Sequence, residues 1–173
     1  NNELIITGNF LDTVDFDFSA SVFNMISSGL TDIFLVKYSE NLNFLTGFKI
    51  GGTSSDISTS ICIDPVGAIS ILGRFNGTVD FNPSTTATFN LTNNTTFVNG
   101  AGDIFLAKFS NNGTFNTAAN IGATGGSAIV KLDSNGDYII AGIFKYQSDF
   151  DPTSGINLVL PTATGSSTLF YSK

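Results

Sequence analysis

The chain has 173 residues, of which 42% are hydrophobic, and this content excludes a generally disordered protein. Charged residues make up 12%, with 14 Asp and Glu against 7 Lys and Arg, so the net charge is −7. This acidic balance, without any basic run, argues against nucleic acids and anionic membranes as partners. Because no apolar run approaches about 18 residues, we also expect no insertion into a membrane.

The first third of the chain predicts short β-strands. Leu4–Phe10 is a β-branched run that ends soon after a glycine, and Thr13–Asp17 follows as a brief extended piece. Ser19–Gly29 is mixed and predicts a strand with a loop. Two further strands are predicted at Asp32–Tyr38 and Phe44–Ile50.

The middle of the chain predicts four strands, which we label A to D. Strands A and B, at Ile57–Ile63 and Ala68–Phe75, are joined by a hairpin turn at Asp64–Gly67. Strand C is predicted at Asp103–Phe109 and strand D at Asn116–Ile121. The Asn-Gly pair at residues 135–136 marks a second hairpin turn of the same kind in the last third of the chain.

These strand patterns recur along the chain. Asp32–Ser39 returns as Asp103–Ser110 after 71 positions (103 − 32), and a weaker copy, Thr168–Lys173, follows after 65 (173 − 108). Gly8 recurs as Gly73 after 65 positions (73 − 8). A period of 65 to 71 residues with about four short strands predicts one blade of a β-propeller per unit. Such a unit must stack on a neighbour to bury both faces of its sheet.

Four segments in order carry a resemblance to a known family: Gly51–Asp56, Ile61–Gly67, Ser70–Gly73 and Gly102–Phe109. Together they resemble the bacterial seven-bladed β-propeller repeat of secreted and cell-surface proteins. The resemblance implies an all-β fold of four-stranded antiparallel blades, export to the cell surface or the medium, and no common enzymatic activity. In the third copy, residues 122–126 lack an aspartate where Asp56 stands, so we expect no role for Asp56 that every blade shares.

About two and a half repeats fit into the chain. We expect a partial blade with strands B to D at residues 1–56, a complete blade at residues 57–126, and a partial blade with strands A to C at residues 127–173. All three belong to one propeller-type domain, and we expect that domain to be part of a larger one. The chain begins with Asn1 rather than methionine, which is typical of a processed or trimmed segment.

The composition is poor in catalytic groups. There is no histidine, so neither a catalytic triad nor a histidine metal site can be built from these residues. Cys62 lies in an apolar strand and predicts a buried, inert thiol. The glutamates, Glu3 and Glu40, lie in or near predicted surface turns. We therefore predict no catalytic residue, no cofactor-binding residue and no metal ligand, and no enzymatic activity.

Aspartate pairs are the main alternative to this prediction. Asp15 and Asp17, and likewise Asp149 and Asp151, are separated by two positions, which on a strand places both on one face. Such a pair could bind calcium or act as a glycosidase-type carboxylate pair. The equivalent Asp80-Phe81-Asn82-Pro83 replaces one aspartate with asparagine, which a turn tolerates and an acid catalyst does not. The pattern thus favours a turn, with calcium as the weaker alternative.

Two further motifs have a functional and a structural interpretation. Asp133-Ser134-Asn135-Gly136-Asp137 has the alternating oxygens of a calcium loop, but lacks its later glycine and glutamate, so we favour a plain hairpin. Lysines recur at equivalent strand positions as Lys37, Lys108 and Lys173. They could form a ring that contacts a ligand, but we expect them to extend along a sheet edge or to pair with a neighbouring blade.

The sequence therefore favours a non-enzymatic extracellular or cell-surface β-propeller that acts as a scaffold or binding module within a larger secreted protein or surface assembly. The alternatives are a segment of a carbohydrate-active or other hydrolytic propeller and a calcium-stabilised adhesin repeat. The expected partners are the remaining blades of the same parent chain or neighbouring protein subunits. A glycan ligand stays open, although 17 phenylalanines without any tryptophan are more typical of core packing than of a carbohydrate platform.

Overall fold

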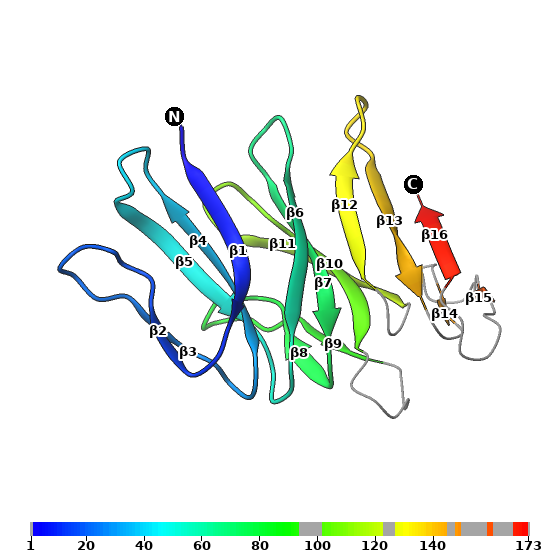
Figure 1. The fold of residues 1–173 in the computed structure, drawn as a ribbon, viewed down its shortest axis with the longest axis horizontal. Helices are drawn as coiled ribbons and strands as arrows, with labels where there is room; N and C mark the ends of the chain where they lie inside the picture. The colour runs from blue at the N-terminus through cyan, green and yellow to red at the C-terminus, as the bar shows by residue number, and fades with distance from the viewer. Residues whose placement is uncertain are drawn as a thin grey trace.

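The chain forms antiparallel β-sheets (Figure 1). The structure is a computed structural model that describes residues 2–93, 102–122, 127–144, 148–149, 159–160 and 168–172. Every regular element in these residues is a strand, so the fold is all-β as predicted. Among the described residues there is accordingly no helix with the length and apolar character needed to cross a membrane.

Three sheets follow one another along the chain. The first sheet has the order β1-β4-β5, with strands Leu4–Phe10, Asp32–Tyr38 and Phe44–Ile50. The second sheet has the order β11-β10-β7-β6, with strands Phe115–Gly122, Asp103–Phe109, Ile69–Phe75 and Ile57–Ile63. The third sheet has the order β12-β13-β16, with strands Ala128–Leu132, Tyr138–Phe144 and Thr168–Ser172.

The predicted strands are confirmed almost residue for residue. Strands A to D correspond to β6, β7, β10 and β11, with β7 one residue shorter and β11 one residue longer at each end. The hairpin turn at residues 64–67 is confirmed, because the Gly67 amide donates to the Asp64 carbonyl at 2.9 Å and Gly67 adopts φ 85°. The turn at residues 133–136 has the same bond at 3.1 Å, with Gly136 at φ 84°. The turn residues and the apolar residues between them thus determine where these strands begin and end.

Each unit also contains a small hairpin that we did not predict in full. These two-stranded sheets lie between strands B and C of their unit, and they comprise β2 (Thr13–Asp15) with β3 (Asn24–Ile26), β8 (Thr78–Asp80) with β9 (Asn90–Thr92), and β14 (Ser148–Asp149) with β15 (Val159–Leu160). In the first two units the hairpin packs apolar side chains, such as Phe16 and Phe81, against the sheet of its own unit.

An aromatic triad fixes this hairpin in the same way in two units. In the first unit, the ring of Phe16 lies 5.6 Å from Phe10 and 4.7 Å from Phe34, measured between centroids. In the second unit, the equivalent distances are 5.5 Å and 4.8 Å, from Phe81 to Phe75 and to Phe105. Centroid distances of this size are typical of favourable aromatic pairs, so the triad is a repeated structural element and not incidental core filling.

A glycine makes room for the triad in strand B. Gly8 is paired with Phe34 across β1 and β4, and Gly73 is paired with Phe105 across β7 and β10. A Cβ atom at Gly8 would lie 2.7 Å from the ring of Phe34, and one at Gly73 would lie equally close to the ring of Phe105. The recurrence of these glycines therefore reflects close approach of an aromatic ring to the neighbouring strand.

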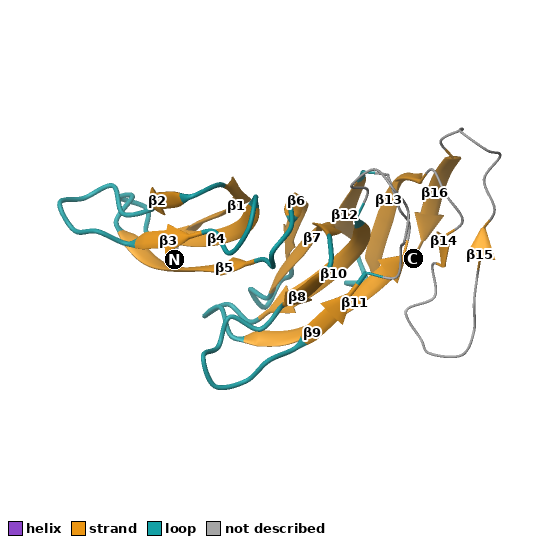
Figure 2. Cartoon of the chain, turned by 90° about the horizontal axis from the view of Figure 1, so that it is seen from below, coloured by secondary structure: helices purple, strands orange, loops and turns teal. Residues whose placement is uncertain are grey.

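The sheets stack side by side, as Figure 2 shows. One buried core lies between the first and second sheets and includes Leu35, Ile50, Ile71 and Ala107. Another lies between the second and third sheets and includes Leu72 and Val130. Within the described residues the sheets do not close into a ring. The second sheet is thus the one whose two faces are both covered by neighbouring sheets.

Candidate binding groove between the first and second sheets

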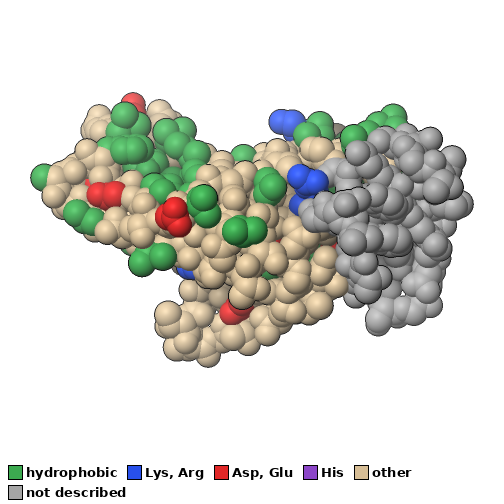
Figure 3. Space-filling view, turned by 60° about the horizontal axis from the view of Figure 1, so that its bottom comes forward, with side chains coloured by type: hydrophobic (Ala, Val, Ile, Leu, Met, Phe, Trp, Pro, Cys, Tyr) green, Lys and Arg blue, Asp and Glu red, His purple; other side chains and the backbone are tan. Residues whose placement is uncertain are grey.

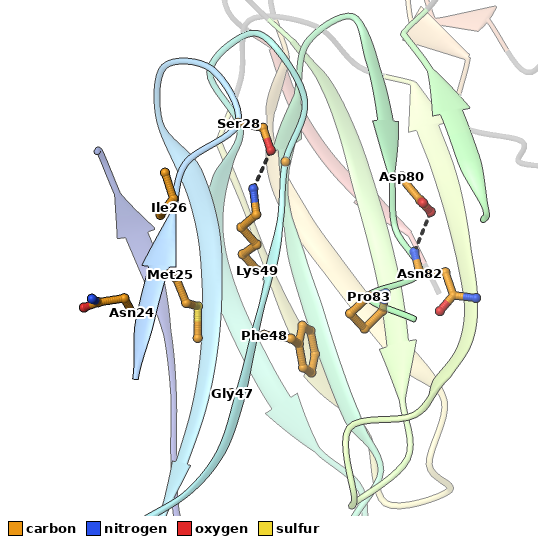
Figure 4. A pocket seen from close by; sticks show the side chains of 11 residues that line it. Asn24, Met25, Ile26, Ser28, Gly47, Phe48, Lys49, Asp80, Asn82 and Pro83 are labelled. Atoms are coloured by element: carbon orange, nitrogen blue, oxygen red, sulfur yellow. Dashed lines mark hydrogen bonds between the residues drawn. The ribbon is translucent and has the colours of Figure 1, made fainter. Parts of the chain in front are cut away.

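A groove of about 510 Å³ lies between the first sheet and hairpin β8–β9 (Figure 4). Its lining comes from β3 with the residues after it, from β5 with the residues after it, and from the end of β8 with the residues after it. The lining residues are Asn24, Met25, Ile26, Ser28, Gly47, Phe48, Lys49, Gly51, Asp80, Asn82 and Pro83.

The floor of the groove is apolar and rigidly held. Met25 is buried in the core of the first unit, and Phe48 packs against Phe109 of the second sheet with ring centroids 4.8 Å apart. A Cβ atom at Gly47 would lie 2.8 Å from the Met25 Cε atom, so the strand and the methionine are already in close contact. An apolar floor with polar groups at its rim is typical of ligand-binding clefts.

Lys49 lies at one side of the groove. Its ammonium group donates to Ser28 Oγ and forms an ion pair with Asp32 Oδ2 at 3.2 Å. The Asp32 side chain is fully buried, and its Oδ2 also accepts a hydrogen bond from the Ser28 amide at 2.8 Å. Since a buried carboxylate already compensates the lysine charge, the groove is not suited to bind an anion through Lys49.

The opposite side consists of the start of the β8–β9 loop. Asp80 Oδ1 accepts hydrogen bonds from the amides of Asn82 at 3.0 Å and Phe89 at 2.8 Å. Asn82 Oδ1 in turn accepts from the amide of Ser84 at 3.0 Å. These side chains close consecutive turns, so this side of the groove has a defined shape before any ligand binds.

A second buried carboxylate lies behind the groove. Asp56 is fully buried, and it accepts hydrogen bonds from the amides of Gly52 at 2.7 Å and Asn76 at 3.0 Å. Burial raises the pKa of Asp56, these two hydrogen bonds oppose the rise, and the nearby charge of Asp32 adds to it. Asp56 therefore fastens the loop between the first two sheets to the end of β7.

The predicted turn role of the aspartate pairs is confirmed where the structure describes them. Asp15 Oδ1 accepts from the amides of Asp17 at 3.0 Å and Phe23 at 2.8 Å, which matches the bonds of Asp80. Asp17 Oδ1 accepts from the amide of Ser19 at 2.9 Å. Of the third pair, the structure describes Asp149 by its backbone in β14, and Asp151 lies outside the described residues.

The loop with alternating oxygens is a hairpin turn. Asp133 Oδ1 accepts from the amides of Asn135 at 2.8 Å and Asp137 at 3.0 Å. Asp64 Oδ1 binds the equivalent amides of Val66 and Ala68 at 3.1 Å and 2.8 Å. One oxygen of each aspartate is thus occupied by the backbone. Among the described residues there is no cluster of three or more His, Cys, Asp or Glu that could hold a metal ion.

The recurring lysines contact the neighbouring unit, as we expected. Lys37 is 5% exposed, and its ammonium group donates to the Asn111 carbonyl at 2.7 Å, in the β10–β11 turn of the second sheet. It also forms an ion pair with Glu3 at 2.7 Å. Lys108 pairs with Asp64 at 3.3 Å and lies 5.8 Å from the ring centre of Tyr138 in the third sheet. Lys173 lies outside the described residues.

Cys62 lies at the interface between the second and third sheets. It is half-buried and packs against the core of that interface. Burial raises the pKa of its thiol above the usual value, and the charge of Lys131 opposes this effect in part. The sequence predicted a buried thiol in an apolar strand; the strand is confirmed, but Cys62 is only half-buried because it lies at the edge of the interface core.

The groove and the carboxylates behind it were not predicted. A usable signal was present, since Asp32 recurs as Asp103, and Lys49 recurs as Asn120, each after 71 positions (103 − 32, 120 − 49). Asn120 donates to Asp103 Oδ2 at 2.8 Å, in the place of the Lys49 ion pair. A polar pair with the same spacing in two units indicates a buried contact between strands C and D.

Comparison with known proteins identifies no relative. No protein-family model matches the chain, no curated protein matches it, and no solved structure matches it. The features of the molecule that bear on function are its repeated architecture and the geometry of the groove.

Proposed function

We propose that the chain is a non-enzymatic β-propeller scaffold and binding module of a secreted or cell-surface protein. Its units stack around a common axis, and the groove between the first and second units receives a protein or glycan ligand. The low share of charged residues, 12%, and the net charge of −7 support an exported module better than a nucleic-acid-binding one.

The observation that carries this proposal is the contact between equivalent strands of successive sheets. Strands β6 and β12 are both strand A of their unit, and side chains of one bind the backbone of the other. Thr59 Oγ1 donates to the Ala128 carbonyl at 2.8 Å, and the Val130 amide donates to Ser60 Oγ at 3.2 Å. Blades that radiate from an axis bring their innermost strands together in this way, which supports a propeller arrangement.

The aspartates argue for a scaffold rather than a hydrolase. Asp15, Asp80 and Asp133 each use one carboxylate oxygen to accept two backbone amides. A general acid or base must exchange a proton with the substrate, whereas each of these carboxylates is engaged by two backbone amides as part of a turn. Within the described residues, no observation favours a hydrolytic or a calcium-dependent propeller over the scaffold.

The experiment combines a ligand screen with a hydrolase screen on the same protein. We expect no turnover of glycosides, esters or phosphoesters, and specific retention of a glycan or protein ligand. Ser28 is exposed and lines the groove beside Lys49 (Figure 4), so Ser28→Tyr should reduce that retention at least tenfold by filling the groove. Asn41→Tyr, at an exposed turn outside the groove, is the matched control and should leave it unchanged.

Hydrolysis that copurifies with the protein and disappears in Asp15→Asn or Asp80→Asn would overturn the proposal. Equal loss of ligand in Ser28→Tyr and Asn41→Tyr would show that the ligand does not bind in the groove. Both outcomes can be read from the same two screens.

A further inference from the structure

At the two ends of the described stack, some apolar side chains are exposed at positions whose equivalents are buried at the interfaces within the stack. Each inner interface joins one face of a sheet, which we call its tail face, to the opposite face of the next sheet, its head face. The first sheet meets the second in this order, and the second meets the third. Among the described residues, no sheet covers the tail face of the third sheet or the part of the head face of the first sheet around Leu4.

The tail face of the third sheet is apolar. Ile143 is paired with Leu169 across β13 and β16, and both point to this face with Tyr171 and Ile129. Leu169 is 77% exposed, whereas Ile104, the equivalent residue of the second sheet 65 positions earlier (169 − 104), is 1% exposed beneath the third sheet. The same strand position is thus fully buried once a further sheet covers it.

The head face of the first sheet is its counterpart. Leu4 is 44% exposed, whereas the equivalent Ile69 (69 − 4 = 65) is fully buried against the first sheet. Phe18 is 71% exposed, and the equivalent Pro83 (83 − 18 = 65) lines the groove beside the preceding sheet. Figure 3 shows apolar side chains gathered over this end of the molecule, which the first sheet and hairpin β2–β3 form.

At each inner interface, two facing residues at equivalent positions are either both apolar or both polar. Between the first and second sheets, the pair is Ile5 and Ile69, which belong to one apolar core. Between the second and third sheets, the pair is Ser70 and Tyr138, whose hydroxyl groups lie 2.6 Å apart. On the two end faces, the equivalent of Ser70 is Ile139 (139 − 70 = 69), and the equivalent of Tyr138 is Leu4 (138 − 4 = 134). A contact between these two faces would therefore again pair two apolar residues.

We propose that the open head face of one copy docks on the open tail face of a second copy, so that the stack continues from chain to chain. This inference rests on the proposed function, because it extends the same stacking of units. The contact joins two different surfaces, and such a contact produces rings or open chains of copies. Its chemistry is that of the inner interfaces, with Leu4 against Ile139 and Leu169 buried.

The first experiment measures molar mass against concentration by light scattering and sedimentation velocity. We expect the wild-type protein to associate as its concentration rises. Leu4→Glu removes the head face and Leu169→Glu removes the tail face, so each variant alone should stay monomeric. Val66→Glu, at an 84% exposed turn position outside both faces, should associate like the wild type.

The second experiment mixes the two monomeric variants. Leu4→Glu keeps an intact tail face and Leu169→Glu keeps an intact head face, so the mixture should form one intact contact and sediment as a heterodimer. A symmetric contact that used one face twice would leave at least one variant associated by itself. Both substitutions are at exposed positions, and circular dichroism with a melting curve should show folding like that of the wild type.

A wild-type protein that stays monomeric throughout the concentration range overturns the inference, and so does a mixture without heterodimer. These results differ from those that would overturn the proposed function, which are hydrolytic activity and ligand binding outside the groove. If the protein is a monomer and its near-ultraviolet circular dichroism shows an ordered aromatic core, the assembly is overturned but the proposed scaffold function is not.

Discussion

Replacing Gly8 or Gly73 with alanine probes the contact between strand B and the aromatic triad. At Gly8 the new Cβ would meet the Phe34 ring at 2.7 Å, and the nearest atoms all belong to this half-buried ring. At Gly73 the new Cβ would meet the Ile57 carbonyl oxygen at 2.1 Å as well as the Phe105 ring. A ring can rotate away, but the backbone of a paired strand cannot, so Gly73→Ala should cost more.

The expected magnitudes follow from overpacking, which typically destabilises by about 1–3 kcal/mol. We expect Gly8→Ala to cost about 1 kcal/mol and Gly73→Ala to cost about 3 kcal/mol or more, because the latter must displace a buried backbone group. For a chain of this length each kcal/mol lowers the melting temperature by about 2–4 °C. Urea unfolding followed by circular dichroism measures both free energies of unfolding.

A double-mutant cycle isolates the contact. Phe34→Leu removes the ring that a Cβ at Gly8 would meet, so Gly8→Ala should cost at least about 0.5 kcal/mol less in that background. The same cycle with Gly73 and Phe105→Leu should recover less, since the Ile57 carbonyl stays in place. Additive effects at Gly8, or a smaller cost at Gly73 than at Gly8, would refute this reasoning.

Three further outcomes can be checked on the purified protein. Leu42 adopts φ 60° where the equivalent Gly113 has φ 86°, so Leu42→Gly should stabilise the fold by about 1 kcal/mol in urea unfolding, and no gain would contradict the strain. The raised pKa of Asp56 means that the folded state binds its proton more tightly than the unfolded state. Its contribution to stability is present at low pH and is lost as the pH rises through the folded pKa, so Asp56→Asn should flatten this part of a stability–pH profile, and an unchanged slope would contradict it. Cys62 should react with a thiol reagent at least about tenfold more slowly in the native state than in urea, because burial raises its pKa, and equal rates would show an accessible thiolate.

The strands could be predicted because their signals are local. In Ile57–Ile63 and Asp103–Phe109 the β-branched and aromatic residues lie between turn residues, and the structure confirms these bounds. Hairpin β8–β9 was missed, because Thr78–Asp80 and Asn90–Thr92 are three-residue strands with no readable alternation. Their pairing depends on the burial of Phe81 against the sheet, which is a tertiary effect.

The groove could not be predicted for a different reason. Its lining comes from residues 24–28, 47–51 and 80–83, which meet because one sheet stacks on the next. Sequence spacing does not report that contact. The ion pair of Lys49 with Asp32 depends on the register of β4 and β5, in which Phe34 is opposite Lys49. The available signal was the recurrence of Asp32 as Asp103 and of Lys49 as Asn120 after 71 positions. This recurrence indicates a buried polar pair between two strands and does not by itself indicate a function.

The aromatic triad has a consequence for how the chain folds. Phe10, Phe16 and Phe34 lie within 24 positions (34 − 10), so closing the loop between them costs little entropy. The contact of Lys37 with Asn111 spans 74 positions and requires two finished sheets. Refolding should therefore proceed in two stages, with each unit collapsing around its own phenylalanines before the units dock. In a pulse-labelling experiment, the amides of β1 and β4 would then gain protection before the side-chain contacts between the sheets have formed.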